Sequence, residues 1–248
     1  MLALIWREFK LGTTTYLLIS YILTPTIYLV IFALTVSTSI SPTIFYEGLY
    51  INYISFIAAG IIGIQTLSMF NQSFALTRLD VVTNFLTVLM TSNTKLYKYI
   101  MARIVTIFSL LSAQFIYVVF LTYLLSGFLP STLGACLALI FMFIGLIFWF
   151  SLGTICGLYV KNELTRDIIM LIVSTPATFL SSSLYNLNQT PPLIRMLGYV
   201  NPLTYIVDLI RSSYFGLSIE PIELLILLAI TSLASFLLGR SIYKFAIK

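Results

Sequence analysis

The distribution of charged residues is the feature that most constrains how this chain folds. Five long stretches contain no Asp, Glu, Lys or Arg: residues 11–46, 48–77, 104–160, 168–194 and 224–239. The hydrocarbon core of a bilayer is about 30 Å thick, and a helix crosses it with about 20 residues. The stretch 104–160 is therefore long enough for two membrane spans, and the Gly- and Pro-containing segment 127–131 predicts the turn between them.

The sequence predicts a single all-α integral membrane domain over residues 1–248 with six transmembrane helices. The predicted spans cover residues 16–37, 51–71, 104–126, 135–157, 168–185 and 221–239. The composition agrees, because 60% of the residues are hydrophobic and 8% are charged, whereas soluble proteins carry about 25% charged residues. This composition excludes a soluble enzyme.

The basic residues predict the orientation of the chain, because Lys and Arg favour the cytoplasmic side. With both termini in the cytoplasm, only Arg195 and Arg211 fall outside. The remaining basic residues are then cytoplasmic: Arg7, Lys10, Arg78, Lys95, Lys98, Arg103, Lys161, Arg166, Arg240, Lys244 and Lys248. The net charge of +5 therefore reflects membrane topology, and we expect no nucleic-acid partner.

Three segments outside the predicted spans have an amphipathic or irregular pattern. Residues 1–12 carry Leu2, Ile5, Trp6 and Phe9 near one helical face, which is typical of a helix lying in the membrane interface. An ordinary charged flank of the first span is the alternative. No small-residue cleavage site follows a short apolar core, so we expect this helix to be retained.

The second segment is the cytoplasmic stretch 71–102. Here apolar residues recur at helical spacing, which predicts an amphipathic helix. Its apolar positions are Leu79, Val82, Leu86, Leu89 and Met90. This helix either rests on lipid or contacts a soluble partner.

The third segment is the long outer stretch 184–220. It contains two consecutive prolines at 191 and 192, and the residues after Pro202 have a helical pattern. Irregular backbone near a membrane is tolerated only where protein or a water-filled cavity surrounds it, so we expect short re-entrant helices here. Asp208 and Arg211 are three positions apart and are predicted to pair on one helix face. A structured outer cap is the alternative to a role in closing a translocation path.

Small and helix-breaking residues lie inside the predicted spans. Gly145, Gly153 and Gly157 form a stripe that permits close helix packing, either within one chain or between two. Pro25 and Pro176 are expected to bend or loosen their helices.

Several kinds of chemistry are excluded by the residues that the chain lacks. It contains no histidine and no Gly-Lys pair, so imidazole catalysis, His-ligated metals and a phosphate-binding Gly-Lys-Ser/Thr loop are absent. The predicted spans contain no deep ionisable residue, which disfavours proton coupling. The remaining functions are a permease powered by another subunit, a stand-alone channel or secondary carrier, and a membrane assembly or scaffold protein.

Two segments resemble the permeases of ABC-2 type transporters. Residues 201–205 read Asn-Pro-Leu-Thr-Tyr, with Asp208 and Arg211 after them, which is similar to a family segment with an arginine six residues after the tyrosine. Upstream, residues 179–182 resemble the family's Leu-Ser-Gly segment. In the cytoplasmic stretch, Leu86, Leu89, Thr91 and Ser92 match the family's pattern, and Arg103 matches a basic residue at the start of the third span.

The resemblance implies a half-transporter. Two such permeases, identical or related, would lie side by side with two separate ABC ATPase subunits that bind ATP and Mg, so this chain itself would need no cofactor. The family exports drugs, lipids and lipid-linked glycans, and we expect the chain in the plasma membrane of a prokaryote or an equivalent organelle membrane. Residues assigned to ATPase coupling are Arg7, Asp80, Leu86, Leu89, Thr91 and Arg103, and those assigned to an outer gate are Asn201, Pro202, Tyr205, Asp208 and Arg211.

Overall fold

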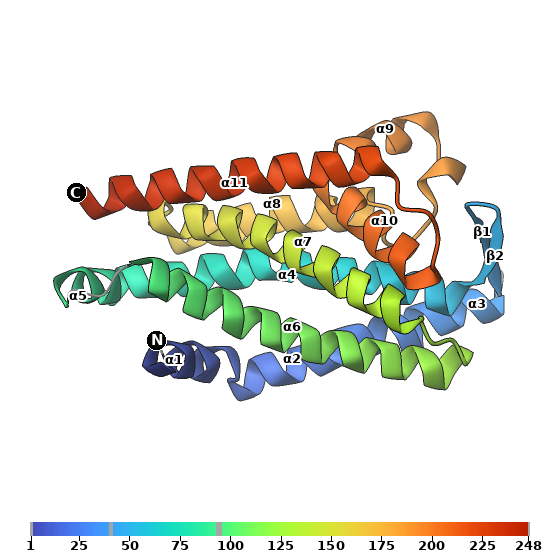
Figure 1. Cartoon of the computed structure of the whole chain (residues 1–248), viewed down its shortest axis with the longest axis horizontal. Helices are drawn as coiled ribbons and strands as arrows, with labels where there is room; N and C mark the ends of the chain where they lie inside the picture. Colours follow the sequence, from blue (N-terminus) through green and yellow to red (C-terminus); the bar gives the residue numbers. More distant parts are fainter. Residues whose placement is uncertain (1, 40–41, 93–95, 248) are drawn as a thin grey trace.

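The structure, a computed structural model, describes residues 2–39, 42–92 and 96–247 (Figure 1). Its first half contains α1 (Leu2–Gly12), α2 (Thr15–Thr26), the π-helix η1 (Ile27–Ala33), α3 (Leu34–Ser39), β1 (Thr43–Tyr46), β2 (Leu49–Asn52), α4 (Tyr53–Val82) and α5 (Phe85–Thr91). Its second half contains α6 (Leu96–Ser126), α7 (Thr132–Tyr159), α8 (Glu163–Leu180), the 3₁₀-helix η2 (Leu187–Gln189), α9 (Pro192–Val200), α10 (Pro202–Phe215) and α11 (Pro221–Ile247).

The long helices run side by side as one bundle, with α4 and α7 at its centre (Figure 1). The two ends of the described chain lie at the same end of this bundle as α5, whereas the β1–β2 hairpin and α9 lie at the opposite end. We call these the α5 end and the hairpin end. The predicted turn at 127–131 is confirmed, because α6 ends at Ser126 and α7 begins at Thr132.

The glycine stripe on α7 packs within the chain. A Cβ on Gly153 would lie 2.3 Å from the Phe70 carbonyl oxygen of α4, and one on Gly157 would lie 2.8 Å from the Phe74 carbonyl oxygen. Gly145 instead faces Ile206 of α10. These close approaches explain why α7 needs small residues at this spacing, and they favour the intramolecular alternative.

Five helical segments of the described chain are long and apolar enough to cross a membrane, so the chain is a predominantly helical membrane protein. They are Leu17–Ser39, Tyr53–Val82, Leu96–Ser126, Thr132–Tyr159 and Pro221–Phe245. The pair α9 and α10, bent by 88°, would make a sixth if it were one broken span. α8 has 18 residues but starts with Glu163, Arg166 and Asp167, and it ends at Leu180, five residues before the end of the predicted fifth span.

The β1–β2 hairpin is an element that the predicted all-α fold does not include. Its antiparallel strands pair Thr43 with Asn52 and Tyr46 with Leu49. The two turn residues, Glu47 and Gly48, both have positive φ, at 45° and 83°, as a two-residue hairpin turn of this kind requires.

The predicted amphipathic helix around 79–90 is also wrong in one respect, because its residues belong to two helices. α4 continues without a break to Val82, and Asn84 then adopts a left-handed φ of 55° before α5 begins. Leu79 and Val82 are exposed, whereas Leu86 and Leu89 are buried. The five apolar positions therefore share no common face.

Candidate functional site

Four charged side chains from three helices form a buried cluster at the α5 end. Arg103 of α6 donates from Nε to Glu8 Oε2 of α1 at 2.7 Å and from Nη2 to Asp80 Oδ2 of α4 at 2.6 Å. Arg7 bonds both acids as well, with 2.6 Å to Glu8 Oε1 and a short contact to Asp80 Oδ1. We call Arg7, Glu8, Asp80 and Arg103 the ionic cluster.

The ionic cluster is neutral overall and nearly closed to solvent. Glu8, Asp80 and Arg103 are at most 2% exposed. Neighbouring hydroxyls complete the hydrogen bonding, because Tyr99 donates to Asp80 Oδ2 and Arg103 Nη1 donates to Thr77 Oγ1 at 3.2 Å. Buried charges are tolerated only when paired in this way, and removing one partner from such a pair costs about 3–5 kcal/mol.

The short helix α5 rests on the ionic cluster through an aromatic ring. The guanidinium carbon of Arg7 lies 3.6 Å from the centre of the Phe85 ring, within the range of a cation–π contact. Leu86 and Leu89 are 4% and 6% exposed and pack with Tyr99 and Leu158 in a small apolar core. The outward face of α5 is instead formed by Thr87, Val88 and Thr91.

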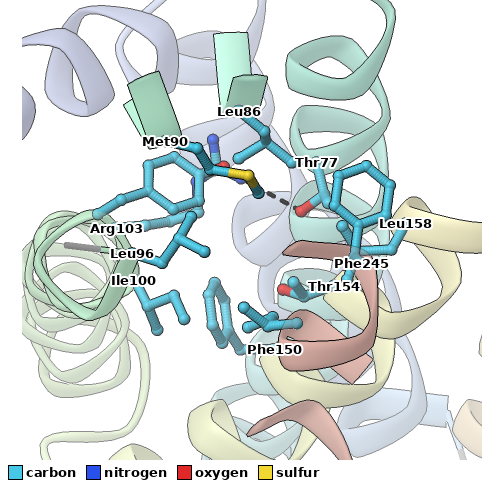
Figure 2. A pocket seen from close by; sticks show the side chains of 12 residues that line it. Thr77, Leu86, Met90, Leu96, Ile100, Arg103, Phe150, Thr154, Leu158 and Phe245 are labelled. Carbon is cyan, nitrogen blue, oxygen red and sulfur yellow. Dashed lines mark hydrogen bonds between the residues drawn. The ribbon is translucent and has the colours of Figure 1, made fainter. Parts of the chain in front are cut away.

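Behind the ionic cluster lies a cavity of about 20 Å³ between α4, α5, α6, α7 and α11 (Figure 2). The side chains of Met90, Leu96 and Phe245 surround it, together with Thr154, whose hydroxyl has no hydrogen-bond partner among the described residues. Packing is thus incomplete on this side, and α5 and α11 meet there across flexible apolar side chains.

Six predicted coupling residues therefore divide into three groups. Arg7, Asp80 and Arg103 meet in one cluster, Leu86 and Leu89 lie in the apolar core beneath α5, and Thr91 is exposed at the end of α5. Glu8 and Tyr99, which complete the cluster, were not among the predicted coupling residues. The sequence pattern could have indicated Glu8, because it follows Arg7 and lies off the apolar face of the amphipathic segment 1–12.

At the hairpin end, the segment 201–205 forms the sharp joint between α9 and α10. The Asn201 side chain accepts a hydrogen bond from Leu203 N at 3.0 Å, which caps α10, and its amide donates to the Ala177 carbonyl of α8 at 2.7 Å. Pro202 takes the first helical position, where its missing N–H costs nothing. Tyr205 donates to the Tyr199 carbonyl at 2.6 Å, so the joint is fixed on both sides.

The predicted pairing of Asp208 with Arg211 is present, with 3.1 Å between Arg211 Nη1 and Asp208 Oδ1. Arg211 is fully buried and also donates from Nη2 to the Ser182 carbonyl at 2.8 Å, while its guanidinium carbon lies 3.7 Å from the centre of the Phe56 ring. Ser182 in turn donates to Asp208 Oδ1 at 2.7 Å. Arg211 thus joins α10, the 181–183 loop and α4.

The carboxylates near this pair make the hairpin end acidic. Partial burial, Asp208 and Glu220 raise the pKa of the Glu47 carboxyl in the hairpin turn. Among the described residues, no group of three or more His, Cys, Asp and Glu side chains is arranged to hold a metal ion. The ion pairs at the α5 end connect α1, α4 and α6. At the hairpin end the ion pair lies within α10, and hydrogen bonds with Ser182 and the contact of Arg211 with Phe56 connect α10 to its neighbours.

These features define a multi-pass membrane protein with one polar centre at each end of its bundle. The sequence model of the ABC-2 type transporter family matches residues 1–215, and the chain belongs to this family. It is a membrane permease of an ABC transporter, a type of protein that associates with ABC ATPase components. No curated protein matches the chain by sequence.

Proposed function

We propose that this chain is the permease subunit of an ATP-driven exporter, in which two permeases form the translocation path and two separate ATPase subunits bind ATP and Mg. The observation that carries this proposal is the ionic cluster. It joins α1, α4 and α6 beside α5, so a displacement of α5 would reach three helices through one set of short contacts.

The proposed orientation has the α5 end in the cytoplasm. Basic residues of this end include Lys10, Arg78, Lys161 and Lys244, and an excess of Lys and Arg favours the cytoplasmic side. Lys95 and Lys248 are also predicted to be cytoplasmic, but they lie outside the described residues. Both ends of the described chain are at the α5 end, which requires an even number of crossings. We therefore count α8 as the fifth of six spans, since its 18 residues reach about 27 Å.

An interfacial position for α1 is supported by the two faces of this helix. Leu2, Trp6 and Phe9 are exposed, whereas Glu8 is buried against the bundle. The apolar face would contact lipid while the charged face holds the ionic cluster. α1 would then follow α5 and α6 when an ATPase moves them.

The coupling surface in this proposal is the outward face of α5, not its buried leucines. Val88 is 59% exposed between Leu86 and Leu89, and it would contact a groove of the ATPase. Thr91 lies at the end of the same face. Leu86 and Leu89 would transmit the movement through the apolar core beneath.

The outer gate in this proposal is the α9–α10 segment. Its joint at Asn201 and Pro202 is bent by 88°, and Arg211 connects it to α4. A shift of α4 at the α5 end would then pull on the gate at the other end, because α4 is one continuous helix between them.

The experiment is reconstitution of the purified permease in vesicles with and without its ATPase, which is found by co-purification from native membranes. A cysteine at Val88 should cross-link to the ATPase, while a cysteine at the lipid-facing Leu171, 66% exposed, should not. Transport should require both nucleotide and ATPase. Uphill transport by the permease alone would contradict the proposal in favour of a secondary carrier.

A further inference from the structure

A second cavity, of about 470 Å³, lies between α2 and α4 inside the predicted membrane region. Gln114 of α6 and Met170 of α8 also line it. Its volume falls within the range of small-molecule sites, roughly 300–1,000 Å³. α2 lies at the edge of the bundle beside α6 (Figure 1), and its residues are largely exposed, so the cavity is close to the lipid.

The wall formed by α4 carries a polar stripe. Gln65, Ser68 and Gln72 all line the cavity, and their spacing of three and four residues puts them on one face of the helix. Polar side chains within a membrane are costly and usually mark a functional pathway. A polar stripe that faces a cavity within the membrane therefore needs an explanation beyond packing.

The amides of this cavity have unused hydrogen-bonding capacity. Both polar atoms of Gln65, together with Oε1 of Gln72 and Oε1 of Gln114, are buried and have no hydrogen-bond partner among the described residues. Three of these four atoms are acceptors. The terminal torsion of glutamine is broad, so the Gln65 amide, which has no bond to break, can turn toward a ligand at little cost.

Pro25 frees a carbonyl of α2, and a cavity glutamine binds it. Proline has no N–H, so the carbonyl four residues earlier, that of Tyr21, loses its helical partner. Gln114 Nε2 donates to this carbonyl at 3.3 Å, and Gln72 Nε2 donates to the Tyr21 hydroxyl at 2.8 Å. Two of the cavity glutamines thus hold Tyr21, and their carbonyl oxygens remain free for another donor.

The lining also restricts the charge of a ligand. No Asp, Glu, Lys or Arg is among the described residues that line the cavity, and much of the remaining wall is apolar, as at Ile64 and Met69. A charged group would lose its hydration there without gaining a counter-ion. A ligand with several hydroxyl donors and an apolar part would satisfy the free acceptors.

We propose that this cavity binds an uncharged, hydroxyl-rich amphiphile such as the sugar headgroup and first chain segment of a neutral glycolipid. Binding itself is independent of the transport mechanism, whereas a role of this site in cargo recognition rests on the proposed export function. The acceptor oxygens of Gln65, Gln72 and Gln114 would take hydrogen bonds from the sugar hydroxyls.

The test uses the full chain in phosphatidylcholine nanodiscs without nucleotide or ATPase. The probe is an octyl-β-glucoside with a diazirine at the end of its chain, compared with the same chain bearing a sulfonate or a trimethylammonium head. We expect saturable labelling of peptides from α2 and α4 by the glucoside, competed by unlabelled octyl glucoside. Equal labelling by all three heads would mean that only the chain binds and would overturn the proposal.

Substitutions then test the glutamines. Gln65→Leu combined with Gln72→Leu should weaken competition by octyl glucoside about fivefold or more, the loss expected for two hydrogen bonds. Gln65→Leu alone should fold normally, because the amide that it removes has no partner. The control Thr106→Val removes a buried hydroxyl of α6 that lies outside the cavity and bonds only its own helix.

Each result has a defined meaning. Unchanged competition in the double variant, or labelling that does not saturate, would show that the cavity holds water or lipid chains without recognising a headgroup. Because binding is measured without ATP, failure here leaves the permease proposal standing. Conversely, glucoside binding would support the site even if no ATPase co-purified with the chain, and the missing ATPase would by itself contradict the proposed function.

Discussion

Glu8 Oε2 and Arg103 Nε lie 2.7 Å apart although 95 positions separate the two residues in the chain. Both side chains are buried, and both also reach the Arg7–Asp80 pair. α1 is therefore attached to the bundle through ion pairs, while Trp6 on its apolar face is exposed. Removal of one charge should release this helix.

Arg103→Leu is expected to destabilise the protein by about 3–5 kcal/mol, because Glu8 and Asp80 would keep buried charges with too few partners. Arg166→Leu is the matched control, since its pair with Asp167 is partly exposed and worth at most about 1 kcal/mol. Chemical unfolding in nanodiscs measures both. Equal losses in the two variants would contradict the assignment of a buried ionic cluster.

Val88→Asp and Leu89→Asp, on adjacent positions of α5, should have different effects. Val88 is exposed, so its variant should fold and insert normally but lose most of the ATP-driven transport. Leu89 is 6% exposed, and a carboxylate there should reduce the yield of folded protein. Yield, thermal unfolding and transport are measured for each; normal transport by folded Val88→Asp would exclude α5 as the ATPase contact.

Reversing the charge of Asp208 or Arg211 alone should impair transport more than exchanging the two residues. The exchange should restore activity only in part, because an arginine at 208 does not reproduce the hydrogen bond to the Ser182 carbonyl or the contact with Phe56. Transport rates of the two single variants and the double variant test this. Identical rates in all three would show that the pair itself is unimportant.

Gly153→Ala should disrupt the packing of α7 on α4, since its Cβ would lie 2.1 Å from Ser73 Oγ and 2.3 Å from the Phe70 carbonyl oxygen. Gly239→Ala in α11 meets no atom within 4 Å, and it should be neutral or stabilise the helix by up to about 1 kcal/mol. Melting temperatures of the two variants provide the comparison. A Gly153→Ala protein as stable as the Gly239→Ala protein would contradict the described helix contact.

Charge patterning was sufficient to predict the helical membrane fold, because the membrane excludes unpaired charge so strongly. Arg7, Asp80 and Arg103 were assigned to coupling through the resemblance to the ABC-2 family, and the structure brings their side chains together. Charge patterning could not predict that Glu8 joins them, since the partner of a side chain depends on which helices become neighbours.

The β1–β2 hairpin was missed for a different reason. Its residues are mostly apolar or aromatic, so all except Glu47 fall within the two charge-free stretches that also contain the flanking spans. The alternation in Thr43–Tyr46 and Leu49–Asn52 around a Glu-Gly turn was a local signal for a hairpin. The helix break at Asn84 had no comparable signal in the sequence. Asn adopts the left-handed conformation in many kinds of turn, so a single Asn does not predict where a helix ends.

The first span is not a continuous rod. Pro25 removes one donor, and the wider turns of η1 follow directly from Ile27 to Ala33. The half before this joint is tied through Tyr21 to the glutamines of α4 and α6, whereas α3 beyond it has no buried residue among those described. Bending strain applied at the hairpin end should therefore dissipate within η1, leaving the geometry around Tyr21 undisturbed.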